Sequence, residues 1–432
     1  MSGYIEFNPD SYIEMCKRAI AELTEECGDI DALSVDTQGE TLILTDENGV
    51  PTRPAIIWLD NRAVAEAEEI KAHFGSKMVY EVTGQTEICA AWPAPKLLWI
   101  KRNQPEVFEK TKKIFLLEDW VLYNLSGEFV TEPTIQSSSI YFDIKNNCWW
   151  QQMLDYIGVS VEMLPKIVPS ATPVGEYKGI KVVSGLLDQI AGTIGAGATN
   201  SSIISEMTGT IMVICVPTDK MPAYREDNII PCHAHALPGM YCLLLCSSTA
   251  GMALKWFKNE LAESFSFKEL DKLAEKVNPG CDGLTMLPYL CGASSPKYNP
   301  NVRAVFSGID LSHTRAHFAR AIMESIAYNL KDNLEYIGSS DIKEIRITGG
   351  GAASPLWAQI KSDVTGKTLS TLTEGETACL GTALAAAVGV GEFASISEAA
   401  NSIVRTGKTY SPSGADYTEH FERYKNLDNL HC

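Results

Sequence analysis

Asp188 is the residue of this sequence whose setting most strongly suggests chemistry. It follows the apolar stretch 180–183, stands directly before Gln189, and precedes a small-residue segment that contains Gly195 and Gly197. A carboxylate at the end of a strand can act as general base towards a bound hydroxyl group, and glycines let other backbone approach closely. An aspartate at the start of a helix also caps free N–H groups without any substrate. Taken alone, the residue leaves catalysis and helix capping both open.

A run of three glycines, 349–351, ends a strand-like segment and is followed by Ser354 and Pro355. Three glycines let a ligand approach the main chain, and the free amides of a helix that begins at Pro355 favour anionic oxygens. The spacing matches neither the G-x-x-x-x-G-K-[ST] phosphate loop nor the G-x-G-x-x-G dinucleotide motif, so an NAD-dependent oxidoreductase is disfavoured. A phosphate or nucleotide loop and a tight structural turn both remain open.

The cysteine pattern does not predict a metal centre. The sequence has 12 cysteines but no C-x-x-C pair, and several lie in apolar runs, so we interpret them as reduced thiols. Cys232, His233 and His235 come closest to a cluster, but they are crowded and lack a second group of ligands. We therefore expect no metal site built from protein ligands alone.

Length and charge narrow the class of protein. A chain of 432 residues with 45% hydrophobic content exceeds one ordinary domain, so two domains are expected. The net charge of −18 disfavours nucleic acid as a partner and favours a small ligand. The chain opens without a signal-peptide pattern and contains no apolar window of about eighteen residues, so we expect a cytoplasmic protein without a membrane partner.

Hydrophobic spacing predicts the elements that must position these residues. It indicates an opening helix over 11–27, strands over 32–36 and 41–45 with a turn at 46–49, and an Ala/Glu-rich helix over 63–73.

A small-residue segment at 195–205 marks the domain boundary, which gives domains 1–198 and 203–432. The second domain repeats the style of the first, with strands around a glycine turn followed by a helix over 249–256.

Several segments in chain order resemble the FGGY carbohydrate kinases of the actin/hexokinase ATPase superfamily, and the xylulokinase-like members among them. The resemblance covers nearly the whole chain. It implies an α/β fold of two actin-like ATPase (ribonuclease H-like) domains with an interdomain cleft. The similar segments are the first signature at 93–103, the catalytic-base segment at 188–197, the second phosphate hairpin at 207–210, the second signature at 304–324 and the adenosine-side loop at 349–354.

The resemblance implies ATP-dependent phosphorylation of a ketose or related polyol in the first domain. Asp188 would be the catalytic base that accepts the proton of the attacking hydroxyl. Gln38, Gly39 and Gln189 would bind the substrate. Asp60 matches a family corner near that pocket, where contact with the substrate and a structural pair with Arg62 are both open.

The same resemblance places the nucleotide in the second domain and implies ATP and Mg²⁺ as cofactors. For Lys255, an exposed position on a helix without a role in binding is an equal alternative. The residues implied to bind nucleotide are Thr208, Gly209, Thr210, Gly251, Lys255, Gly350, Gly351 and Ser354.

One departure from the family pattern bears on activity. Family members begin with a strand and a hairpin that carries Asp-x-Gly-Thr, and no such motif occurs in this sequence. We therefore expect the first domain to be N-terminally truncated, with half of the phosphate clamp missing and a sheet edge exposed. The alternative function is a catalytically impaired family member that binds sugar or nucleotide without efficient phosphoryl transfer. Pairing as a homodimer is left open.

Overall fold

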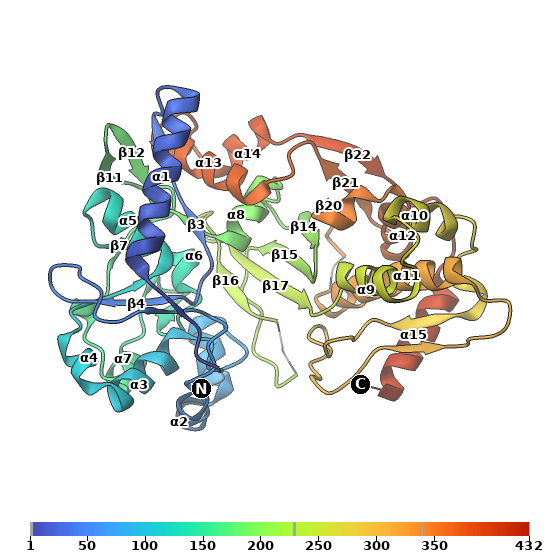
Figure 1. Cartoon of the computed structure of the whole chain (residues 1–432), viewed down its shortest axis with the longest axis horizontal. Coiled ribbons are helices and arrows are strands. Elements are labelled where there is room, and N and C mark those ends of the chain that lie inside the picture. The colour runs from blue at the N-terminus through green and yellow to red at the C-terminus, as the bar shows by residue number, and fades with distance from the viewer. Residues whose placement is uncertain (1–2, 228–229, 339, 432) are drawn as a thin grey trace. The chain divides into compact units, whose positions relative to one another are not determined.

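The computed structural model describes residues 3–227, 230–338 and 340–431. The chain divides into two compact units, which are described separately (Figure 1). Unit 1 comprises residues 1–199, 218–242 and 376–403, and unit 2 comprises residues 200–217, 243–375 and 404–432. Among the described residues, no helix combines the length and the apolar character that a bilayer span requires.

Unit 1 is a mixed α/β unit whose helices come from both ends of the chain. Its helices are α1 (Pro9–Cys27), α2 (Val64–Thr83), α3 (Pro93–Asn103), α4 (Pro105–Lys110), α5 (Leu117–Ser126), α6 (Pro133–Gln136), α7 (Gln151–Ile157), α8 (Asp188–Gly195), α13 (Thr377–Gly389) and α14 (Ile396–Ile403), with a short 3₁₀ helix η1 (Val161–Met163).

The strands of unit 1 are short. They are β1 (Glu6–Phe7), β2 (Ala32–Leu33), β3 (Asp36–Thr37), β4 (Leu42–Thr45), β5 (Ala55–Ile56), β6 (Lys113–Leu116), β7 (Val130–Thr131), β8 (Phe142–Asp143), β9 (Cys148–Trp149), β10 (Lys166–Ile167), β11 (Pro173–Tyr177), β12 (Ile180–Val183), β13 (Leu186–Leu187) and β16 (Cys232–Ala234). One sheet has the order β1-β5-β4-β6, a second has the order β11-β12-β2, and β13 pairs with β3.

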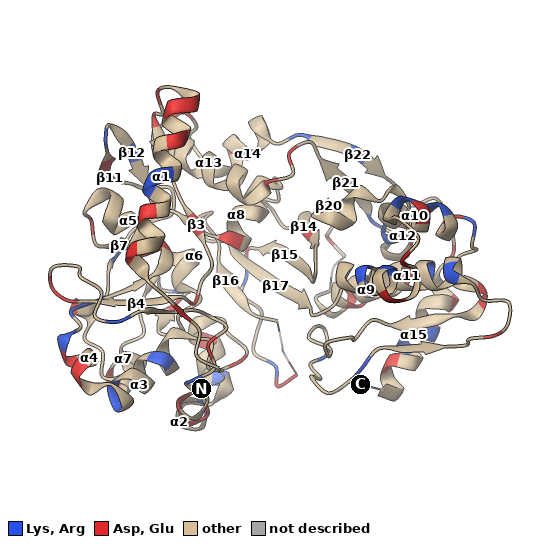
Figure 2. Cartoon of the chain, in the orientation of Figure 1, with Lys and Arg blue, Asp and Glu red and all other residues tan. Residues whose placement is uncertain are grey.

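Helix α1 shows how sequence and packing combine in unit 1. Asn8 caps its first turn, accepting from the N–H of Asp10 at 2.8 Å, and Pro9 occupies its first position. Ile13 is buried in a cluster with residues of α5 and β12, and Leu33 of β2 packs against that cluster. Most of the remaining helix surface is exposed, and acidic positions recur along it (Figure 2). The helix is therefore held by one apolar face.

Unit 2 combines a larger sheet with long helices. Its helices are α9 (Gly251–Leu261), α10 (Phe267–Ala274), α11 (Arg315–Tyr336), α12 (Pro355–Thr365) and α15 (Thr418–His431), with 3₁₀ helices η2 (Cys281–Gly283) and η3 (Gly350–Ala353). Its strands, which lie wholly or mainly in this unit, are β14 (Ile203–Thr208), β15 (Met212–Thr218), β17 (Tyr241–Ser247), β18 (Thr285–Leu287), β19 (Val305–Ser307), β20 (Glu344–Thr348), β21 (Thr368–Leu372) and β22 (Thr406–Tyr410).

The sheet of unit 2 is mixed and follows the order β17-β15-β14-β20-β21-β22. Strands β14, β20 and β21 are parallel, whereas the hairpin partner β15 and the edge strand β22 are antiparallel to their neighbours. The glycine run follows β20, turns through η3 and enters α12, whose first turn is capped by Ser354 Oγ at 3.1 Å from the N–H of Trp357. The predicted strand, glycine turn and helix are therefore present.

The division of the chain near residue 200 lies between the two domains expected from the sequence, 1–198 and 203–432. Two later segments, 218–242 and 376–403, nevertheless belong to unit 1. Helix α13 of the second segment packs against α8. A Cβ added to Gly195 would lie 1.8 Å from Thr377 O, and one added to Gly381 would lie 1.9 Å from Ala191 O. Glycine therefore permits the two helices to touch through their backbones, which is the close approach expected at Gly195.

Candidate active site

Asp188 lies where a parallel strand pair of unit 1 ends. Strand β13 pairs with β3 in parallel, with Leu187 opposite Thr37. Asp188 and Gln38 are the next residues of the two strands, so they leave the same edge side by side. Asp188 is also the first residue of α8, which makes it both the end of a strand and the start of a helix.

Buried polar groups brace the strand that carries Asp188. The N–H of Gly185 donates to Glu118 Oε1 at 3.1 Å. The N–H of Leu187 donates to Thr134 Oγ1 at 2.8 Å, and this hydroxyl donates to Glu132 Oε1 at 2.6 Å. These bonds satisfy backbone groups of a two-residue strand that has few ladder bonds of its own, so they fix the direction in which Asp188 leaves it.

The surroundings of Asp188 change the proton affinity of its carboxyl group. Its Oδ1 accepts from the N–H of Gln189 at 2.6 Å. Burial raises the pKa of Asp188 to about 6, against the lowering effect of the Gln189 hydrogen bond, and the negative charge of Asp36 raises it further. A carboxyl group with this pKa is ionised at neutral pH and still binds a proton readily.

The loop after β3 brings further predicted residues to Asp188. Gln38 donates through Nε2 to Thr41 Oγ1 at 2.8 Å. A Cβ added to Gly39 would lie 2.3 Å from Ser138 Oγ, so only glycine allows this close approach. The structure therefore brings Gln38, Gly39, Asp188 and Gln189 together in unit 1; we call these four residues together with Glu40 the carboxylate site.

Glu40 is the member of the carboxylate site that no sequence argument singled out. Burial raises the pKa of Glu40 to about 7. The positive charge of Lys96 and a hydrogen bond from Ser138 oppose this shift, and the negative charge of Asp188 adds to it. Two electrostatically coupled carboxyl groups with pKa values near neutrality are a common feature of reactive sites. The signal available in the sequence was only its position next to Gln38 and Gly39.

Lys96 anchors the backbone around the carboxylate site. Its side chain is buried, and Nζ donates to the carbonyl oxygens of Glu40 at 3.1 Å and Ile57 at 2.9 Å and to that of Ala91. Burial lowers the pKa of Lys96 to about 8, against the raising effect of the Glu40 charge. One ammonium group thus joins three separate loops, which requires a lysine or an equally long donor at this helix position.

Asp60 forms the pair with Arg62 that was one of its two alternatives. Its side chain is fully buried, and Oδ2 accepts from the N–H of Ile5 at 2.6 Å. Arg62 donates to both carboxylate oxygens, from Nε at 2.8 Å and from Nη2 at 2.7 Å. Burial opposes ionisation, but these hydrogen bonds outweigh it and hold the pKa of Asp60 below its ordinary value. Both oxygens of Asp60 are thereby engaged by the protein.

In unit 2, the turn between β14 and β15 packs against two glycine segments. The N–H of Gly251 donates to Gly209 O at 2.9 Å, and a Cβ on Gly251 would lie 2.4 Å from that same oxygen. Gly349 has φ +74° and would place a Cβ 2.7 Å from Thr208 O. A Cβ on Gly351 would lie 2.6 Å from Thr208 Cγ2. Close packing accounts for glycine at all three positions.

The hydroxyl of Thr208 is turned into the protein. Thr208 Oγ1 donates to Glu206 Oε1, and Lys361 Nζ donates to Thr208 Oγ1 at 2.7 Å and to Glu206 Oε2 at 2.8 Å. All three side chains are buried. A ligand beside this turn therefore meets the main chain of Thr208, while the hydroxyl holds a buried ion pair in place.

A pocket of about 380 Å³ in unit 2, which we call the glycine pocket, collects the residues predicted to bind nucleotide. The volume falls in the range of small-molecule sites. Sequence reasoning missed its apolar wall, since Met252, Leu254, Phe267 and Trp357 had no spacing that distinguished them from core residues. Asp271 also lines it, and burial raises the pKa of its carboxyl group against the lowering hydrogen bond of Ser354. The predicted lining residues are Thr208, Gly209, Thr210, Gly251, Lys255, Gly350, Gly351 and Ser354.

No group of three or more His, Cys, Asp and Glu side chains that could hold a metal ion occurs in the described part of the chain. His233 and His235, the nearest approach in the sequence, are both buried, and burial lowers the pKa of each to about 4. His233 Nε2 lies 3.3 Å from Gln85 Nε2, so this ring is part of a hydrogen-bonded interior.

Two protein-family models together match most of the chain. Residues 1–205 match the N-terminal domain, and residues 208–390 the C-terminal domain, of the FGGY family of carbohydrate kinases. Xylulose kinase of Bacillus subtilis is 28% identical over 99% of this chain and 89% of its own length. Glycerol kinase of Thermococcus kodakarensis is 30% identical over 92% of this chain and 83% of its own length.

Solved structures show the same two-domain α/β fold. The ligand-bound xylulose kinase of Lactobacillus acidophilus has a TM-score of 0.91 at 24% identity, over 100% of this chain and 90% of its own. Xylulose kinase of Rhodospirillum rubrum has a TM-score of 0.90 at 25% identity, over 100% of this chain and 91% of its own. The fold class expected from the sequence is therefore confirmed, and the chain belongs to the FGGY family of ATP-dependent carbohydrate kinases.

Proposed function

We propose that this chain transfers the γ-phosphoryl group of ATP to a hydroxyl group of a ketose or related polyol, with Asp188 as general base. The observation that carries the proposal is Asp188 itself, at the end of β13, with a pKa raised to about 6 by burial and beside the Gln38–Glu40 loop. Proteins similar to this chain include a xylulose kinase, a gluconokinase and a glycerol kinase, which supports a sugar or polyol as acceptor.

In the proposed reaction, the acceptor hydroxyl lies against Asp188 while Gln38 and Gln189 hold neighbouring hydroxyl groups. The hydroxyl oxygen attacks the γ-phosphorus, its proton passes to a carboxylate oxygen of Asp188, and the bond to the β,γ-bridging oxygen breaks to release ADP. Glu40 is expected to accept a hydrogen bond from a further hydroxyl, because its buried carboxyl group retains proton affinity near neutral pH.

The glycine pocket is proposed to hold the nucleotide. Its apolar wall of Phe267, Leu254 and Trp357 suits an adenine ring, and the main chain of Gly350 and Gly351 suits the sugar and phosphate groups. Lys255 is exposed at the mouth of this pocket, where its charge would face the phosphates.

Mg²⁺ is proposed as the accompanying cation, and the carboxylates of unit 1 fit it. This ion takes one or two protein carboxylates and completes its shell with phosphate oxygens and water. Asp36 stands beside Asp188 closely enough for its charge to raise the pKa of Asp188, so these two carboxylates would hold it. When bound, Mg²⁺ would neutralise charge on the phosphate oxygens.

The test is an ADP-release assay with ATP, Mg²⁺ and a panel that contains xylulose, gluconate and glycerol, combined with mass detection of the phosphorylated product. We expect sugar-dependent ADP release that equals the phosphorylated product formed. Saturable sugar or nucleotide binding without that product would instead support the impaired family member that the missing Asp-x-Gly-Thr motif suggests. ADP release that no acceptor changes would overturn the proposal.

A further inference from the structure

Asp271 is the one carboxylate among the described residues that line the glycine pocket. It lies on α10 four residues after Phe267, so both side chains leave the same face of that helix. Phe267 also lines the pocket, and it is 47% exposed although it is a large aromatic residue. A carboxylate therefore stands one helical turn from the aromatic ring against which a nucleobase would pack.

Two other polar side chains of this wall are already engaged by the protein. Trp357 donates its indole N–H to Met323 O at 3.0 Å. Ser354 Oγ accepts from the N–H of Trp357 at 3.1 Å, and the Ser354 hydroxyl donates to Asp271. A hydroxyl has a single proton, so Ser354 has no proton left for a ligand. The carboxylate of Asp271 has two acceptor oxygens and keeps one of them available.

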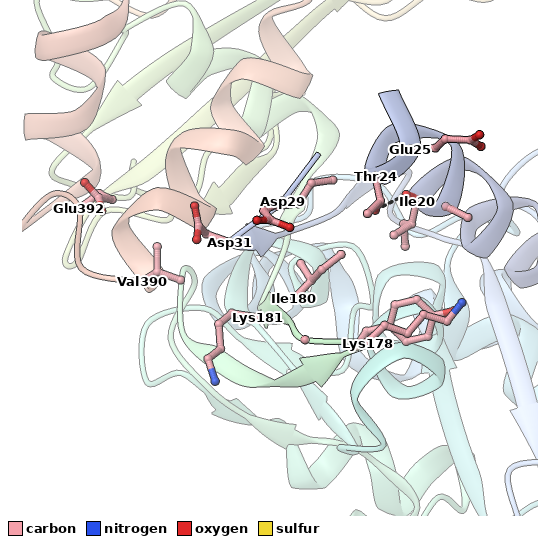
Figure 3. Close-up of a pocket in the computed structure, with 14 residues that line it drawn as sticks. Ile20, Thr24, Glu25, Asp29, Asp31, Lys178, Ile180, Lys181, Val390 and Glu392 are labelled. Carbon is pink, nitrogen blue, oxygen red and sulfur yellow. Dashed lines mark hydrogen bonds between the residues drawn. The ribbon is translucent and has the colours of Figure 1, made fainter. Parts of the chain in front are cut away.

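Burial separates Asp271 from the carboxylates of a larger pocket, of about 960 Å³, in unit 1 (Figure 3). Asp271 is partly buried. Burial raises the pKa of its carboxyl group, the charge of Glu275 adds to this shift, and the hydrogen bond from Ser354 opposes it. A carboxylate that has lost water gains more from a ligand donor than a solvated one does. The carboxylates of the larger pocket are all exposed and solvated: Glu25, Asp29, Asp31 and Glu392.

The charge of Asp271 limits which part of a nucleotide it can meet. Phosphate oxygens are negative, so a carboxylate repels them. Gly351 packs against Thr208 of the β14–β15 turn, whereas Ser354, three residues later, reaches Asp271. The lining thus runs from the turn, where main chain suits phosphate, to α10, where Asp271 and Phe267 suit the base.

A carboxylate with one engaged oxygen distinguishes between purines. Adenine carries an exocyclic amino group that donates, whereas guanine and hypoxanthine carry an acceptor oxygen at the same position. Guanine also presents two neighbouring donors, but these would need both oxygens of the carboxylate, and one of them accepts from Ser354. The amino group of adenine needs a single acceptor, which Asp271 supplies.

On the basis of the proposed nucleotide binding in the glycine pocket, we propose that Asp271 accepts a hydrogen bond from the exocyclic amino group of adenine. It thereby selects 6-aminopurine over 6-oxopurine nucleotides, because an oxo group would place an acceptor oxygen against the carboxylate and leave both unpaired. The apolar wall packs against any base, so it supplies affinity, whereas Asp271 supplies the discrimination.

The test is calorimetry of the full chain with ADP and with inosine diphosphate, which differs from ADP only in the 6-oxo base. We expect the wild-type chain to bind ADP about tenfold or more tightly than inosine diphosphate. In Asp271→Asn this ratio should fall towards one, because an amide can accept from the amino group or donate to the oxo group. Partial unfolding of the variant would change the stoichiometry for both ligands and leave the ratio of their dissociation constants unaltered.

The matched control is Glu275→Gln, which removes the same charge from an exposed position directly after α10 and should keep the wild-type ratio. Equal affinities of the wild-type chain for the two nucleotides, or the same ratio in Asp271→Asn, would overturn the proposal and leave the nucleotide site standing. Absence of ADP binding would contradict the nucleotide site itself. If Asp271→Asn weakens ADP but not 2′-deoxy-ADP, the carboxylate binds the ribose, which also overturns the proposal.

Discussion

The carboxylate site of unit 1 and the glycine pocket of unit 2 handle buried charge in opposite ways. In unit 2, Glu206 is paired with Lys361 and hydrogen-bonded by Thr208, so the charges neutralise each other. In unit 1, the pKa values of Asp188 and Glu40 are raised towards neutrality, because no nearby cation fully offsets the effect of burial. A buried charge with a full set of partners, such as Glu206, holds a backbone turn in place. A buried carboxylate with too few partners, such as Asp188, takes up a proton more readily.

The largest expected effect comes from removing the unsatisfied charge. Asp188→Asn should lower kcat by roughly 10²- to 10⁴-fold, because the base is lost while shape is kept. It should not lower the free energy of unfolding at pH 7. A folded pKa near 6, above the ordinary value of 3.8, means that ionisation costs folding stability as pH rises through this range.

Steady-state kinetics and urea unfolding check the Asp188→Asn prediction. The matched control is Asp219→Asn, an exposed position of unit 1 that should change neither quantity. Wild-type turnover in the Asp188 variant would contradict Asp188 as general base, and the raised pKa of this carboxyl group would then have no role in catalysis.

Breaking the satisfied charge of unit 2 should affect stability instead. Lys361→Met leaves the buried carboxylate of Glu206 without its cation and is expected to cost about 3–5 kcal/mol of unfolding free energy. Glu206→Gln/Lys361→Met removes both charges and should recover most of that loss. Urea unfolding of the two variants checks this, and equal instability of the single and double variants would contradict a charge-based explanation.

Two neighbouring glycines separate binding from packing in the glycine pocket. A Cβ at Gly350 meets no atom within 4 Å, whereas one at Gly351 would lie 2.6 Å from Thr208 Cγ2. Gly350→Val should therefore weaken ADP binding about tenfold, about 1.4 kcal/mol, with unchanged stability. Gly351→Val should destabilise the fold. Calorimetry with ADP and thermal unfolding distinguish the two variants. Unchanged ADP affinity in Gly350→Val would contradict nucleotide binding in the glycine pocket.

The smallest expected effect concerns pH. Asp188 must be ionised to accept a proton, so kcat/KM should fall below pH about 6. The charge of Asp36 raises the pKa of Asp188, and Asp36→Asn should therefore move this acidic limb to lower pH. Because Asp36 is also a proposed ligand of Mg²⁺, the variant should lower kcat as well, and the position of the limb is the quantity that tests the pKa. Asn can still accept from Thr382 Oγ1, which donates to Asp36 at 2.7 Å. A pH profile of both proteins checks the shift, and movement to higher pH would contradict it.

Local patterns in the sequence were sufficient for much of the fold. The helix expected over 11–27 is α1, and the stretch 180–183 is β12. The strand, glycine turn and helix around Gly349–Gly351 followed from turn chemistry and the proline at the start of α12. These features depend on neighbouring residues, whose preferences the sequence displays directly.

Contacts between distant segments could not be anticipated in the same way. The return of 376–403 to unit 1 depends on α13 meeting α8 through glycines that also occur in ordinary turns. The Lys361 pair with Glu206 joins residues 155 positions apart. The hydrogen bonds that Asp60 accepts from Ile5 and Arg62 could not be anticipated, because an Asp near an Arg in the sequence looks the same whatever the carboxylate binds.

The sequence by itself determined the family, the order of the elements and the residue types available for phosphoryl transfer. The spacing of motifs can be recognised without knowing which distant residues are in contact. Only the tertiary structure decided which side chains are buried and which carry partners. It raised the pKa values of Asp188 and Glu40 and committed the Thr208 hydroxyl to Lys361. Burial and charge pairing are set by groups far apart in the chain, and they have no signature in local sequence.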